Sequence, residues 1–295
     1  MQTNNPVLSR YEKADAPGFA YDEGRSAFAQ ASGEAPTASP TARTTPATQP
    51  AGTPPAGTDA QFETITAGGG VRVTLNDVVV KSAIMFGLVV AFAFVGWNLI
   101  TAVPGLMLPI FIGAIALGFV NALKKNVSPA LMIVFAVVEG LMLGGISNWY
   151  NSYAVVNGWD GIVLQAVVAT MTTFGVMLTL YLTGVIKVTK RFTQILMVAA
   201  VSYLVLALAS FVAAMFGVGG GWGFYGVDGI GILISLAGVG IASFFLALDF
   251  EAIKQGVAMG LPERESWRMA FGLLVTLVWI YLEFLRLFAI LSGRE

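Results

Sequence analysis

The sequence predicts an all-α membrane protein with seven transmembrane helices and a polar N-terminal tail. Hydrophobic residues make up 56% of the chain and charged residues only 11%, against roughly 25% charged residues in a typical soluble domain. After residue 70 the apolar residues fall into long runs separated by short polar breaks. Buried helices of a soluble protein are excluded because no amphipathic helix is left to cover them. Lipid is therefore the expected solvent of this chain.

The first 70 residues have a different composition from the rest. They hold eight of the twelve prolines, and the stretch from Ala31 to Ala60 is almost wholly Ala, Pro, Thr, Gly and Ser. Such a segment cannot bury enough apolar surface to offset the entropy of ordering it. We expect residues 1–70 to form a disordered cytoplasmic tail, either a plain extension or an interaction tether, and residues 71–295 to form the membrane domain.

Seven apolar runs are long enough to span a bilayer. A spanning helix needs about 20 residues, because each residue adds 1.5 Å across a hydrocarbon core of roughly 30 Å. Only Ala102 and Val103 separate the first two runs, which indicates a tight hairpin. The predicted helices cover residues 78–101, 104–123, 130–150, 161–186, 192–216, 230–254 and 266–291.

The basic residues predict the orientation of the chain. They lie in every second connection between helices, and the other connections contain no Lys or Arg. The positive-inside rule then predicts a cytoplasmic N-terminus and an external C-terminus, in a multi-pass protein that we expect in the plasma membrane. The basic residues are Lys124, Lys125, Lys187, Lys190, Arg191, Lys254, Arg264 and Arg268. The aromatic residues expected at the outer interface are Trp149, Tyr150, Tyr153, Trp159, Trp222 and Tyr225.

Composition also excludes several kinds of chemistry. The chain has no Cys and no His, which rules out disulfides, thiolate or imidazole zinc sites and Ser-His or Cys-His catalytic pairs. A net charge of −1 does not suit a nucleic-acid-binding protein, which needs a basic patch. We expect no cofactor and no enzymatic activity. An intramembrane aspartyl protease is the enzymatic alternative, but neither Asp249 nor Glu283, the two acids that could serve it, lies in such a motif.

Few ionisable residues lie within the predicted spans. An ionised side chain at the centre of a spanning helix costs about 2.5–3.5 kcal/mol on insertion scales, so each one needs an explanation. Lys81 lies one turn into the first helix, where its side chain is expected to reach the headgroups. Glu139 lies near the middle of the third helix, beside the GxxxG step formed by Gly140 and Gly144, which favours close approach of another helix. Glu139 is either a hydrogen-bonded structural residue or a pore or proton site.

The last two predicted helices carry the other intramembrane charges. Glu251 and Lys254 are three residues apart, as are Glu283 and Arg286, and both pairs can form local ion pairs. Asp249 has no cation three or four residues away. Two carboxylates that face each other in a low dielectric would not both ionise, and the pair could share a proton or bind a divalent ion such as Ca²⁺. We therefore predict that Asp249 and Glu283 form an ion or proton site.

Two segments resemble the Bax inhibitor-1 family of membrane proteins. The end of the sixth predicted helix reads LALDFEAIKQG, and the seventh contains IYLEFLRLFAIL with its Tyr-Leu-acid-Phe step. The resemblance extends from Val71 to the C-terminus and leaves the tail outside. It implies a fold in which six helices surround a central seventh. Glu283 stands where the family has an aspartate.

The resemblance also implies a function. Bacterial members are linked to a pH-sensitive calcium leak through a pair of acidic residues, which match Asp249 and Glu283 here. Arg286, Glu139 and Lys81 are the expected supporting residues, and Ca²⁺ would be the transported ion. Other members are linked to the regulation of a membrane protease or of stress responses, so the alternative is a regulatory protein that does not transport ions and binds a membrane-protein partner.

Overall fold

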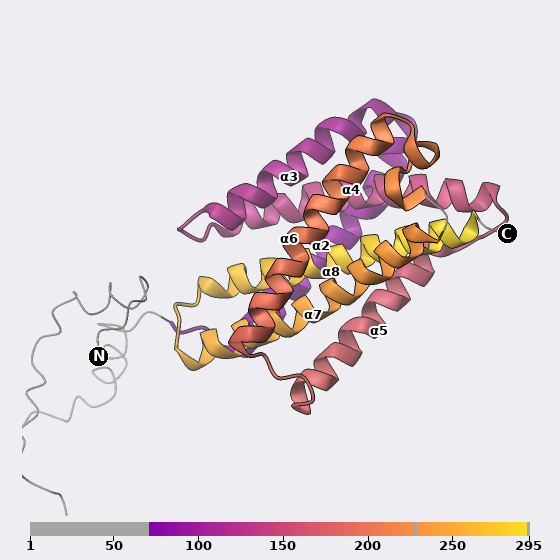
Figure 1. Ribbon diagram of the computed structural model, residues 1–295. Helices are drawn as coiled ribbons and strands as arrows, with labels where there is room; N and C mark the ends of the chain where they lie inside the picture. Colours follow the sequence, from indigo (N-terminus) through magenta and orange to yellow (C-terminus); the bar gives the residue numbers. More distant parts are fainter. Residues whose placement is uncertain (1–70, 227–228, 294–295) are drawn as a thin grey trace, which may run out of the picture. The chain divides into compact units, whose positions relative to one another are not determined.

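The computed structural model describes residues 71–226 and 229–293, and within them seven helices are long and apolar enough to cross a membrane (Figure 1). The described residues form no β-strand beyond an isolated bridge between Arg72 and Pro262. The predicted all-α class and the number of spans are confirmed. The disordered tail predicted for residues 1–70 lies outside the described residues.

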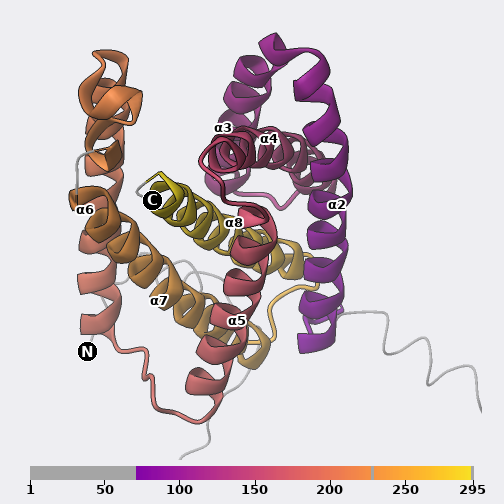
Figure 2. The same cartoon turned by 90° about the vertical axis from the view of Figure 1, so that its right-hand side faces the viewer.

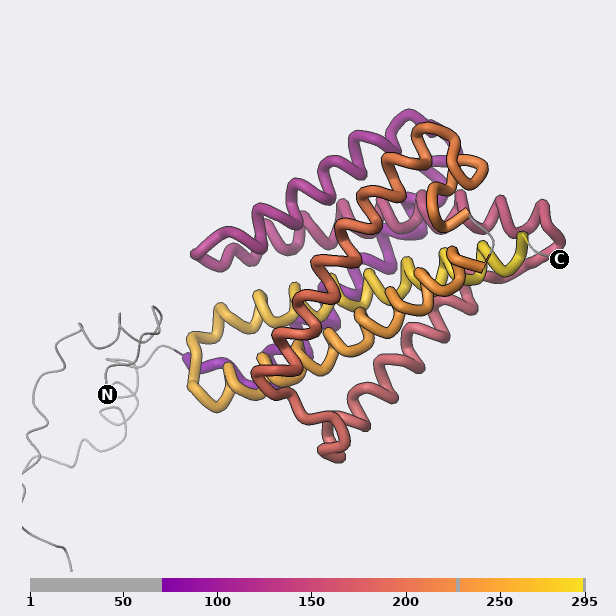
Figure 3. Tube along the Cα trace, viewed as in Figure 1, coloured from indigo at the N-terminus to yellow at the C-terminus, as the bar shows by residue number. Residues whose placement is uncertain are grey.

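The chain crosses from one end of the bundle to the other with each successive helix (Figure 3). Short 3₁₀ turns precede α3 and fill the connection between α6 and α7. The helices are α2 (Leu75–Ala102), α3 (Met107–Leu123), α4 (Pro129–Val156), α5 (Ile162–Leu182), α6 (Lys190–Met215), α7 (Ile230–Ala258) and α8 (Glu265–Ser292), and the 3₁₀ turns are η2 (Pro104–Leu106), η3 (Val218–Gly221) and η4 (Gly223–Gly226).

Three predicted helix ends differ from the structure by four residues or more, those of α4, α5 and α7, and α7 continues to Ala258 instead of residue 254. α4 continues to Val156 instead of residue 150, because its polar side chains bond to carbonyls of their own helix, as Ser152 does to Asn148 at 2.9 Å. α5 ends at Leu182 instead of residue 186, since the chain turns at Gly184 with φ 74°, a conformation that glycine adopts without strain. The sequence prediction had assigned the polar residues after residue 150 to a loop.

Helix starts follow from local capping. Thr74 and Asp77 form a reciprocal cap before α2: the Thr74 N–H donates to Asp77 Oδ2 at 2.9 Å and the Asp77 N–H to Thr74 Oγ1 at 3.2 Å. Thr189 Oγ1 accepts the Phe192 N–H in the same way at the start of α6. Pro129 opens α4, where its missing N–H leaves no bond unmade.

Helix α8 occupies the centre of the bundle. It packs against α2, α4, α5 and α7, and Figure 2 shows it between α2 on one side and α6 and α7 on the other. It also supplies buried side chains to three separate hydrophobic clusters, one shared with α2, α3 and α4, one with α5 and α7, and one with α4 and α5. The predicted central seventh helix is confirmed.

Glycines bring α2 and α4 into close contact. A Cβ built on Gly140 would lie 2.6 Å from the Val89 carbonyl oxygen, and one on Gly144 would overlap the Ala93 carbonyl oxygen. Gly96 of α2 faces Leu141 of α4 in the same way. The close helix approach expected from the GxxxG step is therefore present, and its partner is the first spanning helix.

Helices α3 and α6 lie at the periphery. α3 packs against α4, while α6 packs against α7 and the 3₁₀ turns η3 and η4. The buried residues of α6 are Leu196, Tyr203 and Ser210, which are seven residues apart and form one narrow stripe. Most of the surface of α6 is thus available to lipid.

The basic connections gather at one end of the bundle. Arg268 at the start of α8 donates to the Lys125 carbonyl oxygen at 2.8 Å, which links the α7–α8 and α3–α4 connections. Val73, before α2, donates its N–H to the Leu261 carbonyl oxygen at 2.8 Å. The Tyr181 hydroxyl near the end of α5 bonds to Glu251 near the end of α7. This arrangement agrees with the charge pattern of the sequence.

Aromatic rings gather at the opposite end. Trp222 packs against Trp149, Tyr150 and Tyr153, with ring centroids 5.2, 5.6 and 4.9 Å apart. Trp149 is 58% exposed, as expected of a residue at an interface. Tyr225 departs from that expectation, because it is buried and its ring covers the guanidinium of Arg286.

Candidate functional site

The most extensive buried polar network surrounds Glu283 on α8. Arg286, one turn further along, forms an ion pair with Glu283 Oε2, which confirms the predicted local pair. Glu283 Oε1 accepts hydrogen bonds from the Tyr203 hydroxyl at 2.7 Å and from the Trp279 indole N–H at 3.1 Å. Both carboxylate oxygens therefore have partners, as a buried charge requires.

Arg286 is held on several sides. Its Nη2 donates to the Tyr203 hydroxyl at 2.7 Å, and its Nε lies 3.5 Å from Ser235 Oγ on α7. The guanidinium carbon lies 3.8 Å from the centre of the Tyr225 ring, a cation–π contact. We call Glu283, Arg286, Tyr203, Tyr225, Trp279 and Ser235 the ionic network; it joins α6, α7, α8 and η4.

A glycine makes room for this network. A Cβ on Gly238 of α7 would lie 2.7 Å from Oε2 of Glu283, which is closer than real Cβ atoms approach their neighbours. The Tyr203 hydroxyl also accepts a bond from the Tyr225 hydroxyl at 3.1 Å. Within the described chain, Tyr203 is the buried residue of α6 that bonds both charges of the network. Ser210, two turns further along, accepts the Phe224 N–H of η4 at 3.0 Å, so α6 has specific attachments at these two residues.

Asp249 lies at a different depth, nine residues before the end of α7. Its Oδ1 would lie 3.5 Å from a Cβ on Gly272, so the carboxyl faces α8 at that residue. The hydroxyl of Thr276 can donate either to the Gly272 carbonyl oxygen, 3.2 Å away, or to Asp249. Within the described chain, Oδ2 of Asp249 is buried and has no hydrogen-bond partner.

The structure does not bring Asp249 and Glu283 together. Glu283 lies against Gly238 of α7, whereas Asp249 lies against Gly272 of α8. Each contact is 11 residues from the other along both antiparallel helices, which corresponds to about 16 Å at 1.5 Å per residue. The predicted acid pair is therefore wrong as a direct pair: adjacency in the chain placed the two acids on neighbouring helices, but the helix register separated them.

Ser82 of α2 carries the other unpartnered buried oxygen of the described residues. Val78 and Ile253 share a hydrophobic cluster near the basic end. Ser82 is one turn after Val78, and Asp249 is one turn before Ile253, on helices that run in opposite directions. The two unpartnered oxygens consequently lie at the same depth, one turn inside that cluster.

Lys81 has a specific partner at the basic end of the bundle. Its Nζ lies 2.8 Å from Glu263 Oε1 and 2.7 Å from Ser266 Oγ, and its side chain is 12% exposed. The sequence prediction directed this side chain to the headgroups and did not identify the acid that binds it, which is 182 residues away in the α7–α8 connection. Lys81 thus fixes the first spanning helix to the start of the central helix.

Glu251 also differs from the expectation. It does not rely on Lys254: its Oε2 accepts the Tyr181 hydroxyl at 2.7 Å, and its Oε1 accepts the Gln255 amide at 2.8 Å. This carboxylate connects α5 to α7 near the basic end. The i, i+3 spacing made an ion pair between Glu251 and Lys254 possible, but Glu251 bonds instead to Tyr181 of another helix.

Glu139 is buried in α4, on the face that carries Phe135, Ala136 and Leu143 of the main hydrophobic cluster. In the described part of the chain no hydrogen bond or ion pair reaches its carboxyl group. It is therefore not the hydrogen-bonded structural residue of the first interpretation, and its role as a pore or proton residue stays a prediction.

The acids do not form a conventional metal centre. Among residues 71–226 and 229–293, no three acidic side chains lie close enough to hold a metal ion together. A cation at Asp249 would therefore have one carboxylate and the neighbouring hydroxyl and carbonyl oxygens as ligands, which suits a passing ion better than a tightly held one.

Sequence reasoning missed Tyr203 and Trp279 and assigned Tyr225 to the interface. A usable signal existed for Tyr203: its hydroxyl lies in the middle of a largely apolar span, and a hydroxyl at that depth needs a partner. No pattern in the sequence indicated which charge that partner would be.

The bundle and its interior charges define a multi-pass helical membrane protein. The family comparison then places it: the chain belongs to the Bax inhibitor 1 like family, whose profile matches residues 5–293. This match confirms the resemblance and corrects its extent, since the tail expected to lie outside is largely included. No curated protein is detectably similar to the chain.

Proposed function

We propose that this protein lets cations, Ca²⁺ among them, cross the bilayer under the control of protonation at Asp249. The observation that carries the proposal is the buried, unpartnered Oδ2 of Asp249. A carboxylate oxygen without a donor is costly in a low dielectric, and either a proton or a passing cation removes that cost. The proposed function is transport and involves no catalytic step.

Glu283 has a different part in this proposal. Because Arg286 neutralises its charge and two donors occupy Oε1, Glu283 is not a free ligand for an ion. The ionic network instead holds α6 against α7 and α8 and keeps that end of the bundle closed. In this proposal Asp249 meets the cation at one depth, and Glu283 helps to keep the bundle closed at another. The two acids thus have separate roles and do not form the single acidic pair that the family resemblance implied.

The test is Ca²⁺ entry into liposomes that contain the purified chain and a calcium-sensitive dye. Asp249→Asn keeps the shape of the side chain and removes its charge, and we expect it to lower the entry rate at least about tenfold, corresponding to about 1.4 kcal/mol. Asp160→Asn is the matched control, because Asp160 is an exposed acid in the α4–α5 connection. It should leave the rate unchanged.

Lowering the pH should slow entry through the wild type, because protonation removes the charge that attracts the cation. The same pH change should have little effect on the Asp249→Asn variant. Equal rates in the wild type and both variants, or no entry above empty liposomes, would rule the proposal out.

A regulatory membrane protein with a membrane-protein partner is the second candidate. It is favoured by the completeness of the ionic network, in which Glu283 and Arg286 satisfy each other. The liposome measurement separates the two candidates, since a regulator without transport activity would give no Ca²⁺ entry in any variant.

We also propose that the basic end faces the cytoplasm of a cell with this protein in its plasma membrane. The chain has no native Cys, so single cysteines can report the topology. We expect a membrane-impermeant maleimide to label Asp160→Cys in intact cells and Lys125→Cys only after permeabilisation. Both positions are exposed in the structure. The reverse pattern would invert the orientation.

A further inference from the structure

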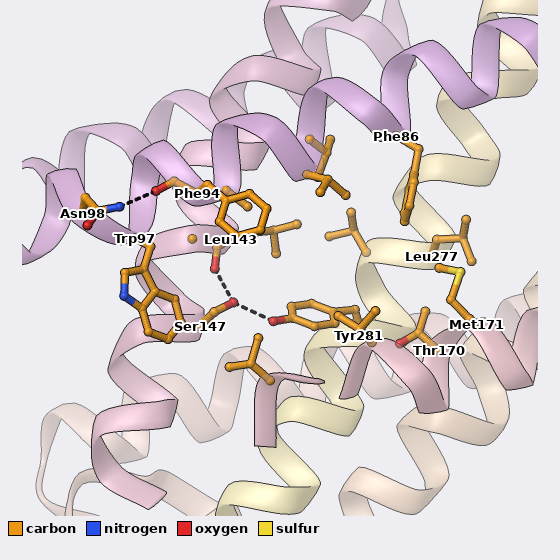
Figure 4. A pocket seen from close by; sticks show the side chains of 17 residues that line it. Phe86, Phe94, Trp97, Asn98, Leu143, Ser147, Thr170, Met171, Leu277 and Tyr281 are labelled. Carbon is orange, nitrogen blue, oxygen red and sulfur yellow. Dashed lines mark hydrogen bonds between the residues drawn. The ribbon is translucent and has the colours of Figure 1, made fainter. Parts of the chain in front are cut away.

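A groove of about 410 Å³ lies between α2, α4, α5 and α8, away from the ionic network (Figure 4). Its volume is within the range of about 300–1,000 Å³ that is typical of ligand sites. α4 and α8 provide buried floor residues, including Leu143 and Val278, which are 5% and 8% exposed. α2 and α5 provide the lips, including Phe94 and Val167, which are 73% and 40% exposed. The groove is therefore open to the side of the bundle, where lipid lies.

The lining of the groove is largely apolar. None of its lining residues is charged. Its hydroxyl groups and the Asn98 amide nitrogen already have hydrogen-bond partners: Asn98 donates to Phe94 at 2.9 Å, Thr170 to Ala166 at 2.7 Å and Ser147 to Leu143 at 2.6 Å, while Tyr281 and Ser147 share a bond of 2.6 Å. Figure 4 shows Ser147 and Tyr281 joined at the floor among apolar side chains.

The length and depth of the groove fit one leaflet. Along α2 it extends from Phe86 to Asn98, about 18 Å at 1.5 Å per residue, which is close to half of the roughly 30 Å hydrocarbon core plus part of the interface. Asn98 is one turn from the end of α2, and Val163 is at the start of α5. The groove therefore extends from mid-membrane to the end of the bundle opposite the basic connections.

We propose that this groove binds one acyl chain of a membrane phospholipid from that leaflet. Hydrocarbon is the only component of the bilayer core that can fill an apolar groove at this depth, and an empty one would forfeit its packing contacts. A free fatty acid is less suited, because the lining offers no cation for its carboxylate. The chain would lie on Tyr281 and Ser147, which join α8 to α4.

The experiment measures lipid retention by the full chain. Protein reconstituted with a phosphatidylglycerol of defined chain length is exchanged into detergent, and retained lipid is counted by native mass spectrometry. We expect one phospholipid per wild-type chain. Val167→Trp and Val90→Trp fill the groove from opposite lips and should each lower retention at least fivefold. Val205→Trp is the control, since Val205 lies on α6 and is 61% exposed outside the groove.

If the tryptophan variants do not fold, photocrosslinking of the wild-type protein tests the proposal. Wild-type protein is irradiated with a phospholipid that carries a diazirine on its acyl chain, and the labelled peptides are mapped. We expect labelling at Val90, Phe94 and Val167 that survives competition by detergent, while labelling of α6 does not. No retained lipid in the wild type, equal retention in the filled variants, labelling spread evenly over the surface, or retention of free fatty acid in place of phospholipid would overturn the proposal.

Discussion

Replacing Arg286 by methionine is expected to lower the free energy of unfolding by about 3–5 kcal/mol. The substitution leaves Glu283 buried without its cation, and removing one partner of a buried ion pair has a cost of this size. The Tyr203 hydroxyl and the Tyr225 ring lose the guanidinium at the same time. The measurement is the unfolding free energy in mixed detergent micelles, obtained by titration with a denaturing detergent.

Two further variants show whether the loss of stability comes from the broken buried ion pair. Arg268→Met removes the cation of the Glu265–Arg268 pair, whose side chains are 25% and 41% exposed, and the bond to the Lys125 carbonyl oxygen. Exposed pairs contribute about 0–1 kcal/mol and a hydrogen bond about 0.5–1.5 kcal/mol, so we expect a smaller loss than for Arg286→Met. Combining Arg286→Met with Glu283→Leu removes both charges and should recover at least half of the loss. If Arg286→Met is no worse than Arg268→Met, the ionic network does not stabilise the bundle.

Substituting alanine for Gly144 is expected to lower the free energy of unfolding by about 1–3 kcal/mol, the usual cost of overpacking. The new methyl group would overlap the Ala93 carbonyl oxygen and lie 2.6 Å from the Trp97 backbone nitrogen. Neither backbone atom can move without moving α2 away from α4. The same detergent titration measures the change.

Gly87→Ala is the matched control for that variant. Gly87 lies in the middle of α2, and nothing lies within 4 Å of a Cβ built there. The control should be neutral or slightly stabilising, because alanine favours helix more than glycine does. Equal stability of the two alanine variants would show that the α2–α4 contact tolerates more separation than the structure indicates.

Spanning helices could be predicted from the sequence because each is a local pattern. The apolar run and its flanking breaks contain the information. The assignment of an end failed where polar residues continue a helix, as after Trp149, or where apolar residues follow the end of one, as after Gly184. The i, i+3 pair of Glu283 and Arg286 was predictable for the same reason, since one helix positions both residues. The central place of α8 came from the family resemblance, and its burial by three clusters confirms it.

The relation between helices was not predictable in the same way. Whether Asp249 faces Glu283 depends on the register of α7 against α8, which packing at Gly238 and Gly272 sets and which no local pattern records. The pairing of Lys81 with Glu263 was unpredictable for a similar reason, since the two residues are far apart in the sequence. A charge in a membrane takes whichever partner the tertiary fold offers at its own depth, and that partner can be far away in the sequence.

The single narrow stripe of buried residues on α6 has a consequence for how the bundle could open. Leu196, Tyr203 and Ser210 bury little apolar area, and lipid chains can replace apolar helix contacts at small cost. What lipid cannot replace are the directional bonds from Tyr203 to the two charges on α8. The attachment of α6 is therefore concentrated in a few directional bonds, those of Tyr203 and the one that Ser210 accepts from the Phe224 N–H. Once these bonds break, the remaining contacts are mainly apolar, and lipid can take their place.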